Sequence, residues 1–373
     1  MKNKKVKLII RIGVIALAAV VMVFAGIYTW AFAIFKKPLY QTWYPEGSMT
    51  FAWMTDTQWM MSWHSPRSLN RINAQTNFIA RGYREGRFDF AVHTGDMSDY
   101  IHRDGPAYDT ASSLWRISTI MRRMDRAGMP YGVLAGNHDM RQITPTESGG
   151  VHFANAETYQ RFFGEHRFRE RADAHPTWNF QTRDDNLTSY HTLVVGGHKY
   201  IFIMMSTFMF TDADLDWLEE TLDYYDDHYA IFLTHAIRLG RGDMWEASDW
   251  ERRDEILISA PNLIGIMWGH WFTGKPENPV PGLPGSPMTD GEARHTIPTT
   301  NQLLTAEQVA ARPEFNGRRN NIVGMFYNHQ QNDASGRYGF TRVVNINPAD
   351  RTITLETYSN VLRTYVDWQQ ARW

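Results

Sequence analysis

Short apolar runs alternate with stretches of helical periodicity along most of the chain. Residues 49–55, 88–93 and 131–135 are apolar runs with the length of buried strands, whereas residues 68–84 carry apolar side chains at helical spacing. The alternation continues to another apolar run at residues 263–268. A strand–helix–strand succession of this kind predicts a mainly parallel sheet covered by helices, which is an α/β fold.

The C-terminal part follows a different pattern. Residues 338–346 and 352–358 alternate in polarity and are joined at residues 347–350, which predicts an antiparallel hairpin. Residues 273–301 show no periodicity and contain six prolines, listed as Pro276, Pro279, Pro281, Pro284, Pro287 and Pro298. A loop of this length inside a domain is usually functional or disordered.

The N-terminal segment has the pattern of a membrane anchor. Residues 12–35 contain no charged side chain, and at about 1.5 Å per residue they can cross a hydrocarbon core. More basic residues precede this run than follow it, so we expect residues 1–11 in the cytoplasm and, after a linker at 36–48, an extracytoplasmic domain at 49–373. A cleaved signal peptide is the alternative, since Ala31-Phe32-Ala33 has the form of a cleavage site, but the apolar run exceeds the usual length.

Composition narrows the chemistry available to the chain. The 373 residues include no cysteine, so any metal ion must be held by oxygen and imidazole nitrogen. The formal net charge is −2, which gives no general attraction for nucleic acid. The chain also lacks the glycine-rich phosphate-binding motifs of P-loop and dinucleotide-binding proteins, which argues against a nucleotide-binding module of those types.

Polar side chains follow the predicted strands at five successive ends. They are Asp56, Asp96, Asn137 with His138, His235 and His270. Each one alone could be a helix cap, a turn residue or a hydrogen-bonded histidine. In open α/β sheets, however, ligands bind beyond the carboxyl ends of the strands. The ordered set therefore predicts a metal site at one edge of the sheet.

These positions resemble the motifs of the calcineurin-like metallophosphoesterase family, which run D-x-H, G-D-x-x-D, G-N-H-[DE], [GT]-H and G-H-x-H. The matching segments are Asp56-Thr57-Gln58, Gly95-Asp96-Met97-Ser98-Asp99, Gly136-Asn137-His138-Asp139, Thr234-His235 and Gly269-His270-Trp271-Phe272. The resemblance implies a sandwich of two β-sheets flanked by helices, in the order α/β/β/α. It also implies two divalent metal ions at the strand ends, with Mn, Fe, Zn or Mg as the candidates.

The resemblance further implies a role for each matching residue. Asp96 would bridge the two ions, and Asn137, His235 and His270 would complete one site. Asp56 and Gln58 would belong to the other site, where this chain departs from the pattern. Gln58 replaces a histidine, as in a branch of the family that reads D-T-Q, and Phe272 replaces another histidine and cannot ligate.

Two outcomes follow for the altered site. It could hold a harder ion such as Mg²⁺ or Mn²⁺ through carboxylates, Gln58 and water. Alternatively it is empty, or it is completed by Asp290, Glu292 or His295 from the following loop.

The resemblance makes His138 the group that acts at the leaving oxygen, with Asp139 orienting it. A plain cap is the competing interpretation of Asp139, and Asp99 is equally ambiguous. Nearby arginines at positions 161, 167, 169 and 171 could attract phosphate, although a solvated face is the expected explanation.

The resulting hypothesis is a membrane-anchored, extracytoplasmic hydrolase of phosphomonoesters or phosphodiesters. Its substrates would be small phosphoesters, nucleotides, or phosphate groups of lipids and envelope polymers. The alternative is a catalytically weakened domain that keeps a metal and binds a phosphorylated ligand. The oligomeric state is not predicted by the sequence.

Overall fold

The computed structural model describes residues 44–62, 66–98, 110–145, 151–206, 211–236, 248–270, 322–328 and 339–373. The predicted cytoplasmic tail, membrane anchor and proline-rich loop, together with most of the linker, lie outside these residues. No helix in the described ranges is long and apolar enough to cross a membrane.

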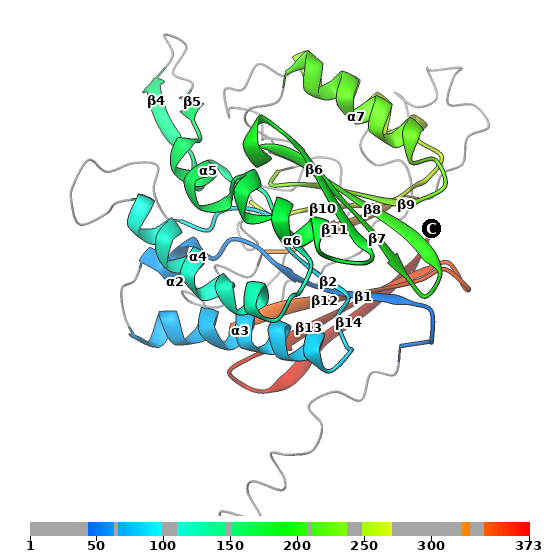
Figure 1. Cartoon of the computed structure of the whole chain (residues 1–373), viewed down its shortest axis with the longest axis horizontal. Helices are drawn as coiled ribbons and strands as arrows, with labels where there is room; N and C mark the ends of the chain where they lie inside the picture. The colour runs from blue at the N-terminus through cyan, green and yellow to red at the C-terminus, as the bar shows by residue number, and fades with distance from the viewer. Residues whose placement is uncertain are drawn as a thin grey trace, which may run out of the picture. The chain divides into compact units, whose positions relative to one another are not determined.

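Two six-stranded sheets form the body of the described structure (Figure 1). The first contains, in spatial order, β14 (Thr364–Arg372), β13 (Thr352–Ser359), β12 (Phe340–Asn347), β1 (Met49–Met54), β2 (Phe90–His93) and β3 (Tyr131–Val133). The second contains β11 (Val323–Phe326), β10 (Leu263–Trp268), β9 (Tyr229–Thr234), β8 (His198–Met205), β7 (Thr188–Val195) and β6 (Trp178–Arg183). Phe202 of β8 lies 4.6 Å from the ring of Phe90 and 5.1 Å from that of Phe51, so the sheets pack face to face.

Each sheet is mixed rather than mainly parallel. In the first sheet β1, β2 and β3 are parallel, whereas β12, β13 and β14 join them in antiparallel register. In the second sheet β8 to β11 are parallel, and β6 and β7 are antiparallel. The alternation of strands and helices predicted only the parallel halves, since antiparallel neighbours need no helical crossover.

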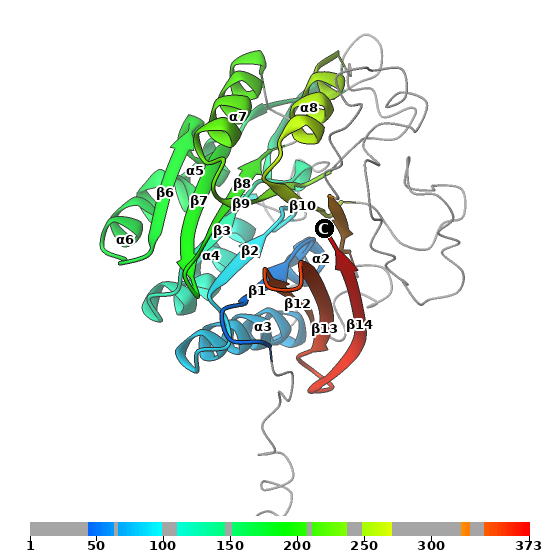
Figure 2. The ribbon, with the colours of Figure 1, turned by 90° about the vertical axis from the view of Figure 1, so that its right-hand side faces the viewer.

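Helices cover the outer face of both sheets (Figure 2). The helices beside the first sheet are α2 (Gln58–Ser62), α3 (Pro66–Arg84), α4 (Thr110–Arg126) and α5 (Glu157–Phe163). Those beside the second sheet are α6 (Arg169–Asp173), which contacts the edge strand β6, and α7 (Asp212–Tyr224) and α8 (Ser248–Ser259). Phe78 of α3 stacks on Tyr358 of β13 at 4.4 Å, which joins helix to sheet. The predicted sandwich of two sheets flanked by helices is therefore confirmed.

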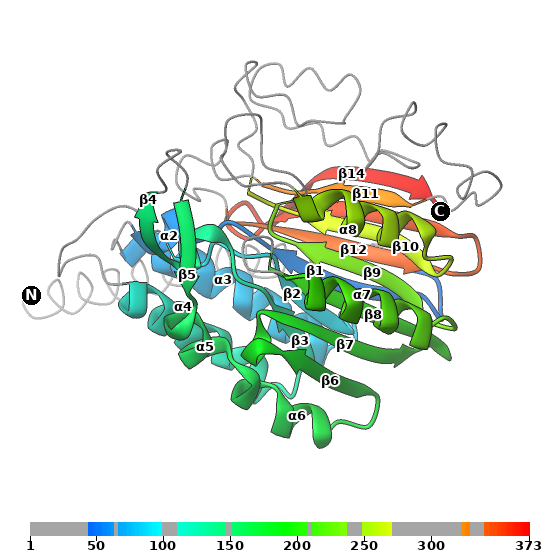
Figure 3. The same ribbon diagram turned by 90° about the horizontal axis from the view of Figure 1, so that it is seen from above.

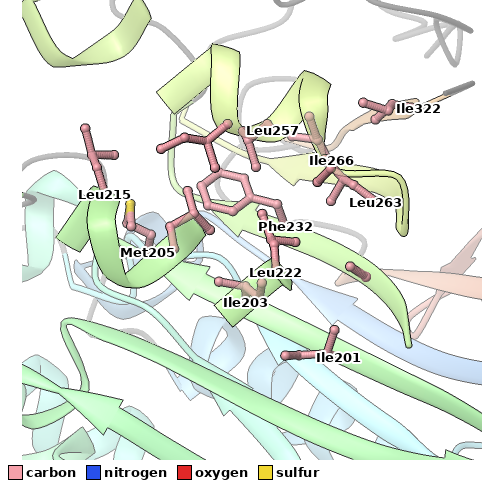
Figure 4. Close-up of a cluster of buried hydrophobic side chains, with 14 of the residues drawn as sticks. Ile201, Ile203, Met205, Leu215, Leu222, Phe232, Leu257, Leu263, Ile266 and Ile322 are labelled. Carbon is pink, nitrogen blue, oxygen red and sulfur yellow. The ribbon is translucent and has the colours of Figure 1, made fainter. Parts of the chain in front are cut away.

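An apolar cluster holds α7 and α8 against the second sheet (Figure 4). Ile203 and Phe232, on neighbouring strands, meet Leu218 of α7 and Leu257 of α8, and all four are buried. Truncating a core side chain of this size to alanine typically destabilises a protein by about 2–5 kcal/mol. The cluster gives β9 and β10 a rigid support, and these strands carry two of the predicted metal ligands.

A short hairpin follows the third motif. Strands β4 (Arg141–Pro145) and β5 (Val151–Asn155) pair with each other in antiparallel register. They project from the end of the sandwich at which α2 begins (Figures 1 and 3).

Two of the arginines expected on a solvated face are in fact structural. Arg167 donates to Asp125 Oδ2 at 3.0 Å and to the hydroxyl of Tyr131 at 2.6 Å, and Arg171 pairs with the same carboxylate at 3.2 Å. The Arg167 side chain is only 8% exposed. These two arginines join α4 to the segment around α6, and the expectation of a solvated face is wrong for them.

His191 of β7 makes the stability of the fold depend on pH. The Trp178 indole N–H donates to His191 Nδ1 at 3.0 Å, and the ring is fully buried. Burial lowers the pKa of His191 from 6.5 to about 3, with help from the charge of Arg171. Between these two pKa values the unfolded chain binds a proton at His191 and the folded protein does not. The contribution of the neutral His191 to the free energy of unfolding is therefore fully present above pH 6.5 and is lost as the pH falls toward 3.

We expect His191→Gln, which keeps an acceptor for Trp178 but does not titrate, to reduce this acid sensitivity. Between pH 7.5 and pH 5 its free energy of unfolding should fall by about 2 kcal/mol less than that of the wild type. Urea titrations of both proteins at the two pH values measure the difference. Equal losses in the two proteins would show that His191 is not responsible.

Candidate metal centre

The five predicted strand ends meet at one edge of the sandwich. Asp56 follows β1, Asp96 follows β2, Asn137 follows β3, His235 follows β9 and His270 follows β10. Asp56, Asp96, Asn137 and His235 are buried, and His270 is partly so. Both sheets therefore contribute to one site, because the parallel strands of the two layers end on the same side.

Four of these side chains form a compact donor group, which we call the first group: Asp96, Asn137, His235 and His270. Nε2 of His235 lies 3.2 Å from Asp96 Oδ1 and 3.1 Å from Asn137 Oδ1. Nδ1 of His270 lies 3.0 Å from Asn137 Oδ1 and 3.1 Å from His235 Nε2. Two imidazole nitrogens, a carboxylate and an amide oxygen at these separations fit a transition-metal ion.

The backbone of Thr94 orients one of the imidazoles. Nδ1 of His235 lies 2.7 Å from the Thr94 carbonyl oxygen, so Nδ1 carries a hydrogen and donates it. In the neutral ring the lone pair of Nε2 then points into the first group. Hydrogen bonding of the outer ring nitrogen in this way is typical of metal-ligating histidines.

The charges of the first group are strongly coupled. Burial alone would raise the pKa of Asp96, but His235 and His138 hold it well below its usual range. Burial opposes a charge on His235 too, yet Asp96 raises the pKa of His235 to about 9. Burial and His235 together lower the pKa of His270 to about 3. An ion on His235 must therefore displace a proton, so its affinity increases with pH.

The second group consists of Asp56, Gln58 and the shared Asp96, and it offers only oxygen. Gln58 Nε2 donates to Asp96 Oδ2 at 2.9 Å, while Gln58 Oε1 is buried and has no hydrogen-bond partner within the described ranges. An orphaned buried acceptor is destabilising by about 1–3 kcal/mol, and a hard cation would satisfy it. Burial raises the pKa of Asp56 to about 7. The residues of this group fit an oxygen-preferring ion.

The loop after His270 lies outside the part of the chain that the structure describes. Phe272 and the possible replacements Asp290, Glu292 and His295 lie outside the described residues, as does Asp99. The loss of one histidine ligand and its replacement from the loop therefore stay predictions.

Three of the predicted ligands adopt a left-handed backbone conformation. The φ angles are 50° for Asp56, 56° for Asp96 and 72° for His270. This conformation is unfavourable for side chains other than glycine and clusters at functional sites. It turns each side chain away from its strand direction and into the common site.

Glycines next to the ligands allow the strand ends to approach closely. A Cβ on Gly136 would lie 2.2 Å from Asp96 Oδ1, and one on Gly269 would lie 2.4 Å from Asp56 Oδ2. The glycines of these two motifs are thus required by the space that the carboxylates occupy.

His138 and Asp139 lie side by side in the chain but have different surroundings. The His138 side chain is 22% exposed, and its Nε2 lies 3.9 Å from Asp96 Oδ2. Asp139 is buried; its Oδ1 accepts from the backbone N–H groups of Met97 and Ser98 at 2.8 Å each, and its Oδ2 from that of Gly136 at 3.0 Å. These contacts match the cap interpretation of Asp139, whereas its orienting role and the catalytic role of His138 stay predictions.

Several known proteins are similar to this chain. A family model described as "Calcineurin-like phosphoesterase" matches residues 49–273. "Uncharacterized protein YvnB" of Bacillus subtilis (strain 168) is 26% identical over 226 residues, which span 60% of this chain and 15% of that protein. A dimetal phosphatase from Danio rerio has a solved structure with 9% identity and a TM-score of 0.44, over 86% of this chain and 98% of that one.

Proposed function

Because the chain belongs to the calcineurin-like phosphoesterase family, we propose that this metal-dependent phosphoesterase hydrolyses phosphomonoesters or phosphodiesters on the outer side of a membrane. The observation that carries the proposal is the first group, in which donor atoms of Asp96, His235 and His270 all lie within 4.8 Å of one another. Two divalent ions bound at such a site would provide an acidified water and neutralise the phosphoryl oxygens.

The chain's own groups have distinct tasks in this proposal. Asp96, Asn137, His235 and His270 would hold one ion, for which Zn, Fe and Mn are suitable. Asp56, Gln58 and Asp96 would hold the other, and their oxygen atoms favour Mg or Mn.

His138 lies at the partly exposed edge of the site and would protonate the leaving oxygen. Asp139, through its three backbone contacts, keeps the turn that carries His138 in place.

A catalytically weakened binding domain is the second candidate. Gln58 and Phe272 stand where the family pattern has histidines, which weakens one of the two metal sites. If only the first group binds an ion, the domain could still hold a phosphorylated ligand without cleaving it. Metal content per chain and turnover separate the two candidates.

The first experiment uses the full chain in detergent, stripped of metal and reloaded with Mn²⁺, Mg²⁺, Zn²⁺ or Ca²⁺ singly. Hydrolysis of p-nitrophenyl phosphate and bis-p-nitrophenyl phosphate is followed beside His235→Ala and the exposed control His166→Ala. Metal-dependent turnover that only His235→Ala abolishes supports the hydrolase. A folded, metal-binding chain that cleaves neither ester with any ion supports the binding domain instead.

The N-terminal segment supports the location that we propose. Residues 12–35 carry no charge, and the basic residues before them favour a cytoplasmic N-terminus. The folded domain would then lie close to phosphate groups of lipids and envelope polymers, as well as to small phosphoesters and nucleotides.

The absence of cysteine provides a direct test of this location. We expect Tyr224→Cys, at a side chain that is 79% exposed, to react with a membrane-impermeant maleimide in intact cells, and Asn3→Cys to react only after lysis. The wild type is the blank, since it has no thiol. Labelling of Asn3→Cys in intact cells, or protection of Tyr224→Cys, would contradict the proposed orientation.

A further inference from the structure

We propose that Thr57 and His93 form a buried positioning pair, which holds the turn of Asp56 and Gln58 against the turn of Asp96 and so sets the affinity of the second group for its ion. Neither residue is among the ligands that the family motifs indicate. The inference rests on the proposed function in one respect, namely that the second group binds an ion. Its test, however, measures ion binding and not hydrolysis.

The pair is a defined hydrogen bond in the interior. Thr57 Oγ1 lies 3.1 Å from His93 Nε2, and the two residues are 1% and 0% exposed. The Gly95 N–H donates to His93 Nδ1 at 3.3 Å, so Nδ1 is the acceptor of a neutral ring and Nε2 carries the hydrogen. His93 therefore accepts from the turn of Asp96 and donates to the turn of Asp56.

The two turns are joined by several contacts, of which one depends on the ion. Gln58 donates to Asp96, but both are ligands in the proposed site, so an ion there competes with their hydrogen bond. The backbone N–H of Asp56 donates to the Gly95 carbonyl at 3.0 Å and fixes the start of the turn. The Trp53 indole N–H also donates to Thr94 Oγ1 at 2.9 Å, ahead of both turns. The bond between Thr57 and His93 is the ion-independent side-chain link that reaches between Asp56 and Gln58 themselves.

Ordinary packing explains this pair poorly. A threonine directly before a helix usually caps it with its hydroxyl, and Thr57 precedes α2, yet this hydroxyl lies at hydrogen-bond distance from His93. A buried polar pair also loses hydration that an apolar pair would not lose. Its advantage is orientation, which is what second-layer partners of metal ligands provide.

The link is insensitive to ordinary changes of pH. Burial lowers the pKa of His93 to about 3, and the nearby His235 acts in the same direction. The ring is neutral at neutral pH, so its donor and acceptor sides keep their assignments.

The test compares Thr57→Val, which removes the hydroxyl at nearly constant volume, with Thr57→Ser, which keeps it. The full chain in detergent is titrated with Mn²⁺ by calorimetry, and thermal unfolding of the metal-free proteins serves as the folding control. We expect the wild type to bind two ions. Thr57→Val should lower the affinity for the second ion by about 10–100-fold and change the affinity for the first by no more than about twofold. Thr57→Ser should bind the second ion with an affinity close to that of the wild type.

Three results would overturn the pair. In the first, Thr57→Val and the wild type bind the second ion with equal affinity. In the second, Thr57→Val loses affinity for both ions to the same extent. In the third, the wild type binds one ion only. A chain that hydrolyses esters but shows one of these results keeps the proposed function and loses this inference. The reverse result, selective weakening of the second ion in a chain without turnover, keeps the pair and removes the hydrolase.

Discussion

Replacing Asp96 by asparagine should reduce hydrolysis by at least about 1,000-fold, because one charge is shared by both groups of the site. Asp96 Oδ1 lies 3.2 Å from His235 Nε2 and accepts from the backbone N–H of His138 at 3.0 Å, and Oδ2 accepts from Gln58. Asparagine keeps the size and one acceptor oxygen but removes the charge that two cations require. Its NH₂ group cannot accept a hydrogen bond, so the bond from either the His138 backbone or Gln58 is lost. Thermal unfolding of the metal-free proteins therefore serves as the folding control.

Initial rates with the more reactive of the two nitrophenyl esters, at saturating metal, measure this effect. Thermal unfolding with and without Mn²⁺ gives a second readout, since an ion that binds only the folded state raises the midpoint of unfolding. We expect that rise to be lost in Asp96→Asn and kept in the exposed control Asp173→Asn. Activity above a tenth of wild type in Asp96→Asn would show that this carboxylate does not bridge the two groups.

Gly136→Ala should be nearly as damaging, although it removes no ligand. The added Cβ would lie 2.2 Å from Asp96 Oδ1 and 2.4 Å from the Asp96 backbone nitrogen, and no real Cβ contact is that short. The φ angle of Gly136 is −93°, so backbone strain is not the cause. Either the turn of Asp96 or that of Asn137 must shift, and we expect hydrolysis to fall by about 100-fold, as for other small displacements of catalytic groups.

Gly128→Ala is the matched control for this substitution. Its φ of 67° strains an alanine, but nothing lies within 4 Å of the new Cβ. Gly128→Ala should therefore lower stability slightly and leave activity and Mn²⁺ affinity unchanged. Gly136→Ala should instead lower both activity and Mn²⁺ affinity. Unimpaired Mn²⁺ binding in Gly136→Ala would show that the two turns can separate without losing the ion.

The sequence predicted the ligand-bearing half of each sheet because those strands are buried on both faces. β1, β9 and β10 are continuous apolar runs, and the polar residue after each run is visible without a structure. β6 is an edge strand of six residues in which buried and exposed side chains alternate at first, and it was not predicted because so short a segment lacks a long apolar run. Among the described strands β14 pairs with β13 alone, and it was not predicted either, since such pairing is set by tertiary contacts rather than by local pattern.

The same distinction separates the predicted ligands from the residues that position them. Asp56 and Asp96 stand in recognisable motifs, but Thr57 and His93 have ordinary local explanations as a helix-preceding threonine and a strand histidine. Their contact joins positions 36 residues apart, which no spacing rule indicates. Arg167 was misjudged for the same reason, because its partner Asp125 lies 42 residues earlier.

The left-handed conformations of Asp56, Asp96 and His270 have a consequence for engineering this protein. Each is unfavourable by about 1–3 kcal/mol, and glycine at the same position would relieve the backbone while deleting a ligand. A library screened only for heat resistance would therefore be enriched in inactive chains with substitutions at these three positions. Directed evolution of this protein needs an activity screen at every round, since substitutions at these three residues that raise heat resistance would lower turnover.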